Sequence, residues 1–508
     1  MKQASFLVMA WALSCALPVC AQEQHSHPVP ERLGKVTFPT SCAPSVQPDF
    51  ERAVALLHSF AYTASEQAFR AVGDADPSCA MAHWGMSMSY FHPLWAPPEG
   101  EQLRKGSAEI DRARELGAGS LRERQFIDAA AAYYRDADHL PPAARAIAYE
   151  RAMAEVAKSN PDDPEAQIFY ALALIATASP TDRSHANQKR AADILEPLYR
   201  RFPQHPGLAH YLIHAYDSAE LASRGVDAAR AYSKIAPSAP HALHMPSHVF
   251  TRLGYWDDSI ASNSAARTAA HAEGDVGEEL HAMDYLTYAY LQRGRETDAG
   301  RVVGDLRAMS PLSGAEFKVG YAATAMPVRF AVERRQWAAA ASLEPLAQSP
   351  PQVAAMVYWA RAIGHARSGR PQESGADLTR LKTCLQQLQS SGNMYWATQT
   401  EILSEAAQAW VLHAQGHGDE AVRRMRSAAD REDAVEKLPV TPGPIVPARE
   451  QLGEILLELK RPQDALREFQ AVLIAAPGRR GALKGAVQAA ELVGDAQTAA
   501  RLHAQLDT

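Results

Sequence analysis

A short pattern of apolar and small residues recurs along this chain and restricts it to a stack of helical hairpins. The clearest copy consists of Leu452, Gly453, Leu456, Ala465, Phe469, Val472 and Pro477. A second copy consists of Leu286, Tyr290, Gly294, Ala299, Val303 and Pro311. The spacing predicts a helix, a turn and a second helix, with a proline where the second helix ends. Because one hairpin cannot bury its apolar face alone, successive hairpins must stack.

The composition indicates an all-α class. Alanine is very frequent, aromatic residues make up 7% of the 508 residues, and alternating runs of β-branched residues are scarce. With 47% hydrophobic residues, the chain can bury a large core in one long domain or in several smaller ones. The net charge of −7 is modest and no basic stripe occurs, so we expect no nucleic-acid partner.

The repeat resembles the tetratricopeptide repeat (TPR) family over most of residues 50–508. Longer strings resemble a group of exported bacterial TPR proteins, and these strings span residues 58–60, 76–82, 244–248 and 439–444. The resemblance implies an all-α, right-handed α-solenoid of TPR-like helix-turn-helix repeats. In such a fold the first helix of each hairpin lines a concave groove, which suits a peptide or protein partner. The resemblance implies no particular reaction.

The repeats and their interruptions predict an order of segments along the chain. These are a signal peptide (1–21), an N-terminal arm (22–48), an N-terminal TPR-like solenoid with a histidine-rich groove (49–310), central TPR-like repeats (311–435), a proline-rich connector (436–449) and C-terminal TPR repeats (450–508). Prolines exclude a helix interior from the connector. It is either a spacer between hairpins or a flap laid over the groove.

The N-terminus has the pattern of a secretory leader. Lys2 supplies the positive charge, an apolar stretch runs from Phe6 to Val19, and the small Ala21 suits signal peptidase. We expect cleavage after Ala21, which makes the mature protein periplasmic or secreted, with no integral membrane segment. The alternative is a lipoprotein anchored at Cys20.

Cleavage leaves three cysteines, Cys42, Cys79 and Cys384. In an oxidising compartment Cys42 and Cys79 are the expected disulfide, because one precedes the first hairpin and the other opens the next helix. The alternative is three buried thiols. No Cys-x-x-Cys motif occurs, which disfavours a thiolate zinc site and a redox dithiol.

Histidines are concentrated in one part of the chain. Eight of the 19 histidines lie within residues 205–281. Three helices are predicted in or beside this region, at 207–217, 240–250 and 279–291. Each carries a stripe of imidazole and carboxylate side chains, and together the stripes consist of His210, His214, Asp217, His241, His244, His248, His281 and Asp284.

The angular position of these stripes is the same on all three helices. Successive helical residues are rotated by roughly 100°, so each helix has an apolar seam, such as Leu243, Pro246 and Phe250. The polar stripe lies roughly 80–160° from the seam in each case. We therefore expect it to line the concave groove rather than to enter the core.

The shared stripe favours a transition-metal site. Imidazoles four positions apart lie on one helical face, and neighbouring helices pack about 8–10 Å apart, so donors from several helices can converge on one ion. Eight donors are enough for two ions, or for one ion with a second layer of partners. Nitrogen and carboxylate donors without sulfur favour copper, zinc, iron or manganese.

Two functions fit this pattern. One is an exported scaffold whose groove binds a peptide or protein partner, or the metal itself. The other is a metal-dependent enzyme, mono- or dinuclear, acting as an oxidoreductase or a hydrolase. Without a metal, the stripe either lines a polar groove and forms hydrogen bonds to a peptide, or it is an ordinary solvated face. No His-Glu-x-x-His, Gly-x-Ser-x-Gly, phosphate-binding or dinucleotide-binding motif supports another enzyme class.

Overall fold

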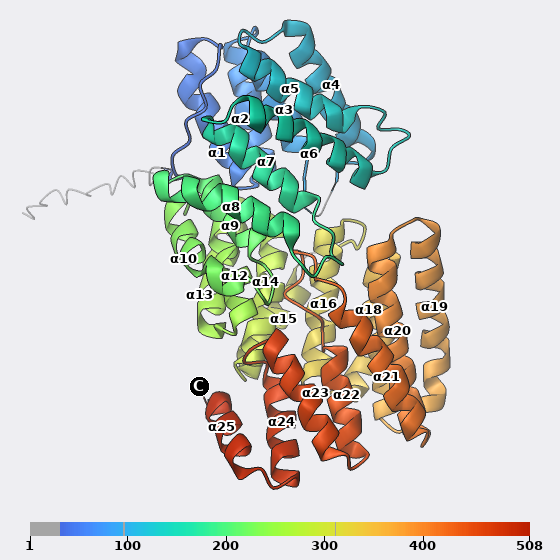
Figure 1. The fold of residues 1–508 in the computed structure, drawn as a ribbon. Coiled ribbons are helices and arrows are strands. Elements are labelled where there is room, and N and C mark those ends of the chain that lie inside the picture. Colours follow the sequence, from blue (N-terminus) through green and yellow to red (C-terminus); the bar gives the residue numbers. More distant parts are fainter. Residues whose placement is uncertain (1–30, 95–96, 310, 508) are drawn as a thin grey trace, which may run out of the picture. The chain divides into compact units, whose positions relative to one another are not determined.

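The structure of the protein, a computed structural model, describes residues 31–94, 97–309 and 311–507. Within these ranges the regular secondary structure is helical and no strand occurs. Consecutive helices pack against one another as hairpins along the chain (Figure 1). The expected all-α class, a solenoid of TPR-like helical hairpins, is therefore confirmed. The expected signal peptide at 1–21, including Cys20, lies outside the described residues.

The helices up to the last one that bears a stripe histidine are α1 (Gln47–His58), α2 (Tyr62–Ala75), α3 (Ala80–Tyr90), α4 (Gly100–Leu116), α5 (Leu121–Tyr134), α6 (Pro142–Ser159), α7 (Pro164–Ala176), α8 (Ala186–Arg201), α9 (Pro206–Ala215), α10 (Val226–Ile235), α11 (Pro240–His244), α12 (Pro246–Leu253), α13 (Trp256–Glu273) and α14 (Val276–Gln292). The following helices are α15 (Glu296–Ala308), α16 (Phe317–Glu333), α17 (Trp337–Ala341), α18 (Pro351–Arg367), α19 (Gly375–Ser390), α20 (Met394–Ala414), α21 (Gly418–Asp433), α22 (Ala448–Glu458), α23 (Pro462–Ala475), α24 (Arg480–Leu492) and α25 (Ala496–Asp507). Short 3₁₀ turns are η1 (Pro44–Val46), η2 (Ala222–Gly225) and η3 (Pro371–Ser374). None of the described helices is long and apolar enough to cross a membrane.

Close packing between neighbouring helices explains the small positions of the repeat. The buried ring of Phe469 in α23 lies against Gly453 of α22 and Gly485 of α24, where an added Cβ would come within 2.7 Å and 2.3 Å of the ring. Near the N-terminus, a Cβ at Gly85 would come within 2.3 Å of Phe69. A glycine is therefore needed wherever an aromatic ring of the neighbouring helix occupies the place of a side chain.

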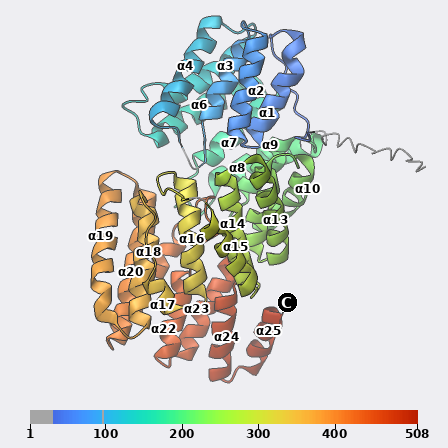
Figure 2. The ribbon, with the colours of Figure 1, turned by 180° about the vertical axis from the view of Figure 1, so that it is seen from behind.

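The C-terminal hairpins also contact the middle of the chain. Helix α24 packs against α14, which can be followed in Figures 1 and 2. The indole Nε1 of Trp256 donates to the carbonyl of Gly478 over 3.1 Å. The buried Arg479 pairs with Glu333 at 2.9 Å and with Glu450 at 2.5 Å. Stacking of neighbours alone does not produce these contacts, so distant repeats are tied together directly.

The proline-rich residues 436–449, which we call the strap, are non-helical as far as Pro447 and are held by buried side chains. The hydroxyl of Tyr285 lies 3.2 Å from the carbonyl oxygens of both Pro439 and Thr441. The guanidinium of Arg329 contacts three further strap carbonyls, those of Gly443 (3.2 Å), Pro444 (2.9 Å) and Ile445 (3.3 Å). Because α14 and α16 carry these two side chains, the strap lies over these two helices like a flap.

The segment before α1 is packed where the structure describes it. Leu33, Val36 and Phe38 are buried, and the ring of Phe38 lies 5.4 Å from that of Trp84 and 5.5 Å from that of Phe50. This part of the expected N-terminal arm therefore belongs to the core.

Cys42 and Cys79 form the expected disulfide, with their Cα atoms 4.8 Å apart. The bond joins the segment before α1 to the residue that precedes α3. The third described cysteine, Cys384, is a buried free thiol, and burial raises its pKa to about 11. The alternative of three thiols is therefore not what the structure shows.

Replacing both disulfide cysteines by serine should destabilise the N-terminal hairpins. The bond spans a sequence separation of 37 residues, for which the chain-entropy relation gives about 4 kcal/mol or less. Calorimetry of the double variant should show a lower midpoint for the transition that includes α1–α3. The variant Cys384→Ala, which removes no bond, is the control and should change the midpoint much less. Equal midpoints for wild type and double variant would contradict the expectation.

Candidate metal centre

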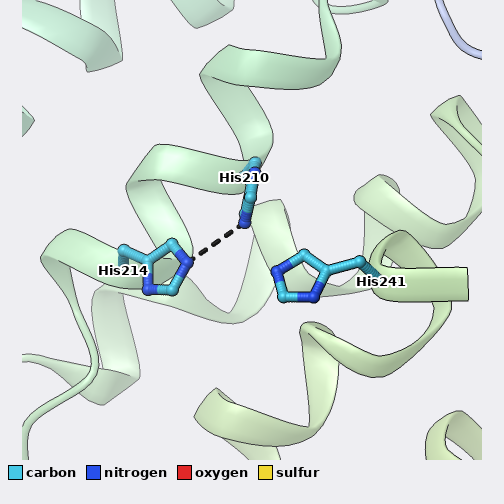
Figure 3. Close-up of side chains that lie close together, drawn as sticks. All are labelled: His210, His214 and His241. Carbon is cyan, nitrogen blue, oxygen red and sulfur yellow. Dashed lines mark hydrogen bonds between the residues drawn. The ribbon is translucent and has the colours of Figure 1, made fainter. Parts of the chain in front are cut away.

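The structure brings the six histidines of the stripe together in two groups, supplied by α9, α11, α12 and α14. The first group consists of His210, His214 and His241, and the second of His244, His248 and His281. Within each group the candidate ligand atoms lie within 4.8 Å of one another. Figure 3 shows the three rings of the first group facing one another.

Ring nitrogens face each other inside both groups. The Nε2 atoms of His210 and His214 are 3.1 Å apart (Figure 3). Those of His244 and His248 are 3.0 Å apart. The ring of His281, on α14, lies with its centroid 4.3 Å from that of His244. The imidazoles of each group are thus close enough together to bind one metal ion.

The two groups are direct neighbours. The ring centroids of His214 and His248 are 6.0 Å apart, and those of His241 and His244 are 6.1 Å apart. Within the second group, the rings of His244 and His248 are 5.0 Å apart. The two groups therefore lie side by side.

Oxygen atoms approach the other ring nitrogen of several of these histidines. The Nδ1 contacts are His210 with the carbonyl of His58 (2.6 Å), His244 with Oδ1 of Asn263 (2.6 Å), His248 with Oδ2 of Asp217 (2.8 Å) and His241 with Oε2 of Glu278 (3.4 Å). A carbonyl or carboxylate oxygen only accepts, so these Nδ1 atoms donate. This is the arrangement in which protein histidines present Nε2 to a metal.

Asp217 is held as an anion by two cations. Its side chain is 5% exposed and pairs with Arg252 and with Lys437 of the strap, each at 2.9 Å. Burial alone raises the pKa of this carboxyl, but Lys437 and Arg252 outweigh burial, so the pKa lies well below its usual range. Asp217 therefore accepts a hydrogen bond from Nδ1 of His248.

The second group contains two facing lone pairs. The amide Nδ2 of Asn263 donates to the carbonyl of Ser259, which leaves its Oδ1 to accept from Nδ1 of His244. Asp217 accepts from Nδ1 of His248. When both imidazoles are neutral, each Nε2 is an unprotonated acceptor, and the two acceptors lie 3.0 Å apart. A proton or a metal cation between them removes the repulsion.

Burial disfavours the proton. All six histidines are at most 5% exposed. Burial lowers the pKa of His248 to about 4, and the pKa values of His210, His214, His244 and His281 lie well below the ordinary value, with burial as the largest cause. These five imidazoles are therefore neutral at pH 7, which is the form that binds metal.

The histidines of the stripe are buried and do not line an open surface. On the second stripe helix Leu243 is partly exposed, whereas His241 and His244 are buried. That helix is also divided into α11 and α12 around Met245. Helices α13 and α14 and the strap cover the face opposite the apolar seam, so a polar angle on one helix does not mean contact with solvent.

The two aspartates of the stripe differ from the histidines. Asp217 lies beyond the C-cap of α9, and its bond to His248 makes it a partner of a candidate ligand. Asp284 is fully buried on α14, with Arg329 3.8 Å away and no hydrogen bond to either carboxylate oxygen, and burial raises its pKa to about 6. Within the described residues, neither carboxylate belongs to the clusters of closely spaced ligand atoms.

Aromatic and strap residues close the centre on two sides. Phe60, in the turn between α1 and α2, adopts a left-handed φ of 53° and places its ring centroid 4.4 Å from that of His210. Such a conformation is strained for a bulky residue and is kept only by its surroundings. On the other side, a cavity of about 10 Å³, close to the size of one water molecule, is lined by His241, Met245, His248, His281, Lys318, Pro439 and Val440.

Sequence reasoning identified Asp217 but not the other partners of the Nδ1 atoms. Glu278 lies three positions before His281 on α14, so i,i+3 spacing could have found it. Asn263 and the carbonyl of His58 come from other helices, and no local pattern indicates them. Tyr285, which follows the stripe residue Asp284 on α14, has its hydroxyl 3.4 Å from Nε2 of His248.

Comparisons with known proteins do not assign this chain to a family. No protein-family model matches it, and no curated protein matches it. Among solved structures, a monomeric mutant of IFIT1 with Gppp-AAAA is 12% identical, covering 92% of this chain and 95% of that one, at a TM-score of 0.33. The P58(IPK) TPR domain is 14% identical, covering 89% and 99%, at a TM-score of 0.23. Neither likeness bears on what this chain binds.

The five buried histidines with lowered pKa values should make the metal-free protein sensitive to acid. Their folded pKa values lie below the unfolded value of about 6.5, so between those values the unfolded state binds more protons. Stability should therefore fall as the pH drops from about 6.5 toward 4, by roughly 1.4 kcal/mol per pH unit for each proton. Urea unfolding in the presence of a chelator measures this slope.

Other buried groups change the stability in the opposite direction as the pH falls. The contribution of the histidines is therefore measured by comparing two histidine variants. Burial raises the pKa of Glu432 and of Glu450 to about 7, and these groups stabilise the fold as the pH falls. His248→Gln should reduce the acid sensitivity, whereas His271→Gln, at a side chain that is 77% exposed, should leave it unchanged. Identical slopes for the two variants would show that His248 is already charged in the folded protein.

Proposed function

We propose that this chain is a metalloprotein that holds two transition-metal ions in adjacent three-histidine sites within a TPR-like scaffold. His210, His214 and His241 bind one ion, and His244, His248 and His281 bind the other. Imidazole donors without sulfur suit copper, zinc or iron. The observation that carries the proposal is the pair of Nε2 lone pairs of His244 and His248 at 3.0 Å.

A metal accounts for this pair better than a hydrogen bond does. Both Nδ1 protons are committed to oxygen acceptors, so no proton remains for the space between the Nε2 atoms. Burial keeps a third proton away, since the pKa of His248 is lowered to about 4. Asp217, ionised and bonded to His248, supplies negative charge at the edge of the site and makes the imidazole a better donor.

The second candidate is a metal-dependent enzyme that uses the same centre, as an oxidoreductase or a hydrolase. An ion with three protein ligands keeps a coordination position for a small molecule, which is typical of catalytic rather than purely structural sites. The small cavity beside His241, His248 and His281 favours this candidate. Tyr285, with its hydroxyl 3.4 Å from Nε2 of His248, is positioned to hold or move a proton there.

The location and the partner belong to the same proposal. Export to the periplasm or the medium agrees with the Cys42–Cys79 disulfide, since such bonds persist in oxidising compartments. The scaffold suits a peptide or protein partner, but such a partner would not meet the histidines, because they are buried and the strap covers them. A partner would therefore dock elsewhere on the repeats.

Metal analysis of protein made without a histidine tag tests the proposal. After loading with zinc and exhaustive dialysis, the wild type should retain at least two ions per chain. His248→Ala removes a donor of the second group and should release at least one ion. His271→Ala, at an exposed histidine on α13, is the matched control and should retain the wild-type content. A wild-type protein that retains no zinc, copper or iron would refute the proposal.

A further inference from the structure

A third cluster of donors lies beside the two histidine groups and comes from three different helices. It consists of His58 at the end of α1, Glu165 in the first turn of α7, and His205, the N-cap of α9. Their candidate ligand atoms lie within 4.8 Å of one another. The three side chains are buried, at 0%, 1% and 5% exposure.

Both imidazoles direct Nε2 at the same carboxylate. Nε2 of His58 lies 2.9 Å from Oε2 of Glu165, and Nε2 of His205 lies 2.9 Å from Oε1. On its other side, Nδ1 of His58 lies 2.9 Å from the hydroxyl of Tyr211. This outer contact fixes the ring orientation in the way that partners of metal-bound histidines do.

The cluster is built around a buried carboxylate, that of Glu165. Glu165 accepts two polar contacts and lies at a helix N-terminus, which favours its ionised form. In the part of the chain that the structure describes, no lysine or arginine forms an ion pair with Glu165. A buried ionised carboxylate is costly unless a cation joins it.

Gly207 leaves room for the ring of His58 beside Glu165. A Cβ at Gly207, in the first turn of α9, would come within 2.6 Å of Nδ1 of His58. Any larger residue there would displace the ring from Glu165. The carbonyl of the same His58 accepts from Nδ1 of His210, which connects the cluster to the first histidine group.

We propose that His58, Glu165 and His205 hold a third metal ion, separate from the two ions of the stripe. Two imidazoles and a carboxylate are nitrogen and oxygen donors that suit zinc, iron or manganese. The ion places a positive charge beside the Glu165 carboxylate. It also ties the end of α1 to the starts of α7 and α9, and so fixes the carbonyl that orients His210.

Counting zinc ions per chain tests the third site separately from the first two. The wild type should hold three ions and Glu165→Gln two, because glutamine keeps the shape but lacks the charge. The matched control is Glu468→Gln, which changes another buried glutamate, one that pairs with Arg426 and Arg449 and with no histidine. This control should hold three ions.

The possible counts separate this inference from the proposed function. Equal counts for wild type and Glu165→Gln overturn the third site, and a proton shared with the histidines then balances Glu165. A wild type with a single ion that Glu165→Gln loses supports the third site and refutes the stripe centre. If Glu165→Gln fails to fold, anomalous scattering from zinc-loaded wild-type crystals decides. A zinc peak between the three side chains supports the site, and its absence overturns it.

Discussion

A buried imidazole must satisfy two ring nitrogens, and the centre of this protein is organised around that requirement. His210, His244 and His248 each direct Nδ1 at an oxygen that only accepts. The acceptors come from three places that are distant in sequence: the end of α1, the middle of α13 and the residues after α9. Helices that share no sequence motif are thus held in register by single hydrogen bonds, each of which would be costly to leave unmade.

Asp217 connects the histidine centre to a network of charged residues around it. The carboxylate bonds His248 and pairs with Arg252 and Lys437, and Arg252 in turn pairs with Glu436 at 2.6 Å. Glu436 and Lys437 belong to the strap. Their ion pairs with Arg252 and Asp217 therefore hold the strap at the histidine centre, and its carbonyl groups contact side chains of α14 and α16. The chain's own proline-rich segment thus lies over α14 and beside the histidines of the centre.

Local patterns were sufficient for some parts of the site and not for others. Spacing at i,i+4 correctly paired His210 with His214 and His244 with His248, because that spacing depends on helix geometry alone. The angle of the stripe predicted a place in the groove, outside the core. It did not indicate that the histidines are buried, because the covering elements, α13, α14 and the strap, come from elsewhere in the chain. His58, Glu165 and His205 share no helix, so their cluster had no signal at all in the sequence.

The sequence by itself determined the helical class, the hairpin repeat, the disulfide pair and the non-helical strap. Each of these depends on the chemistry of nearby residues: glycine opposite an aromatic ring, proline without an amide hydrogen, and two cysteines on adjoining hairpins. Only the tertiary structure decided which histidines meet, which oxygen each Nδ1 contacts, and that the centre is closed to solvent. Those features depend on side chains from distant helices approaching within about 3 Å, a typical hydrogen-bond distance, and no periodicity along one helix encodes such a distance.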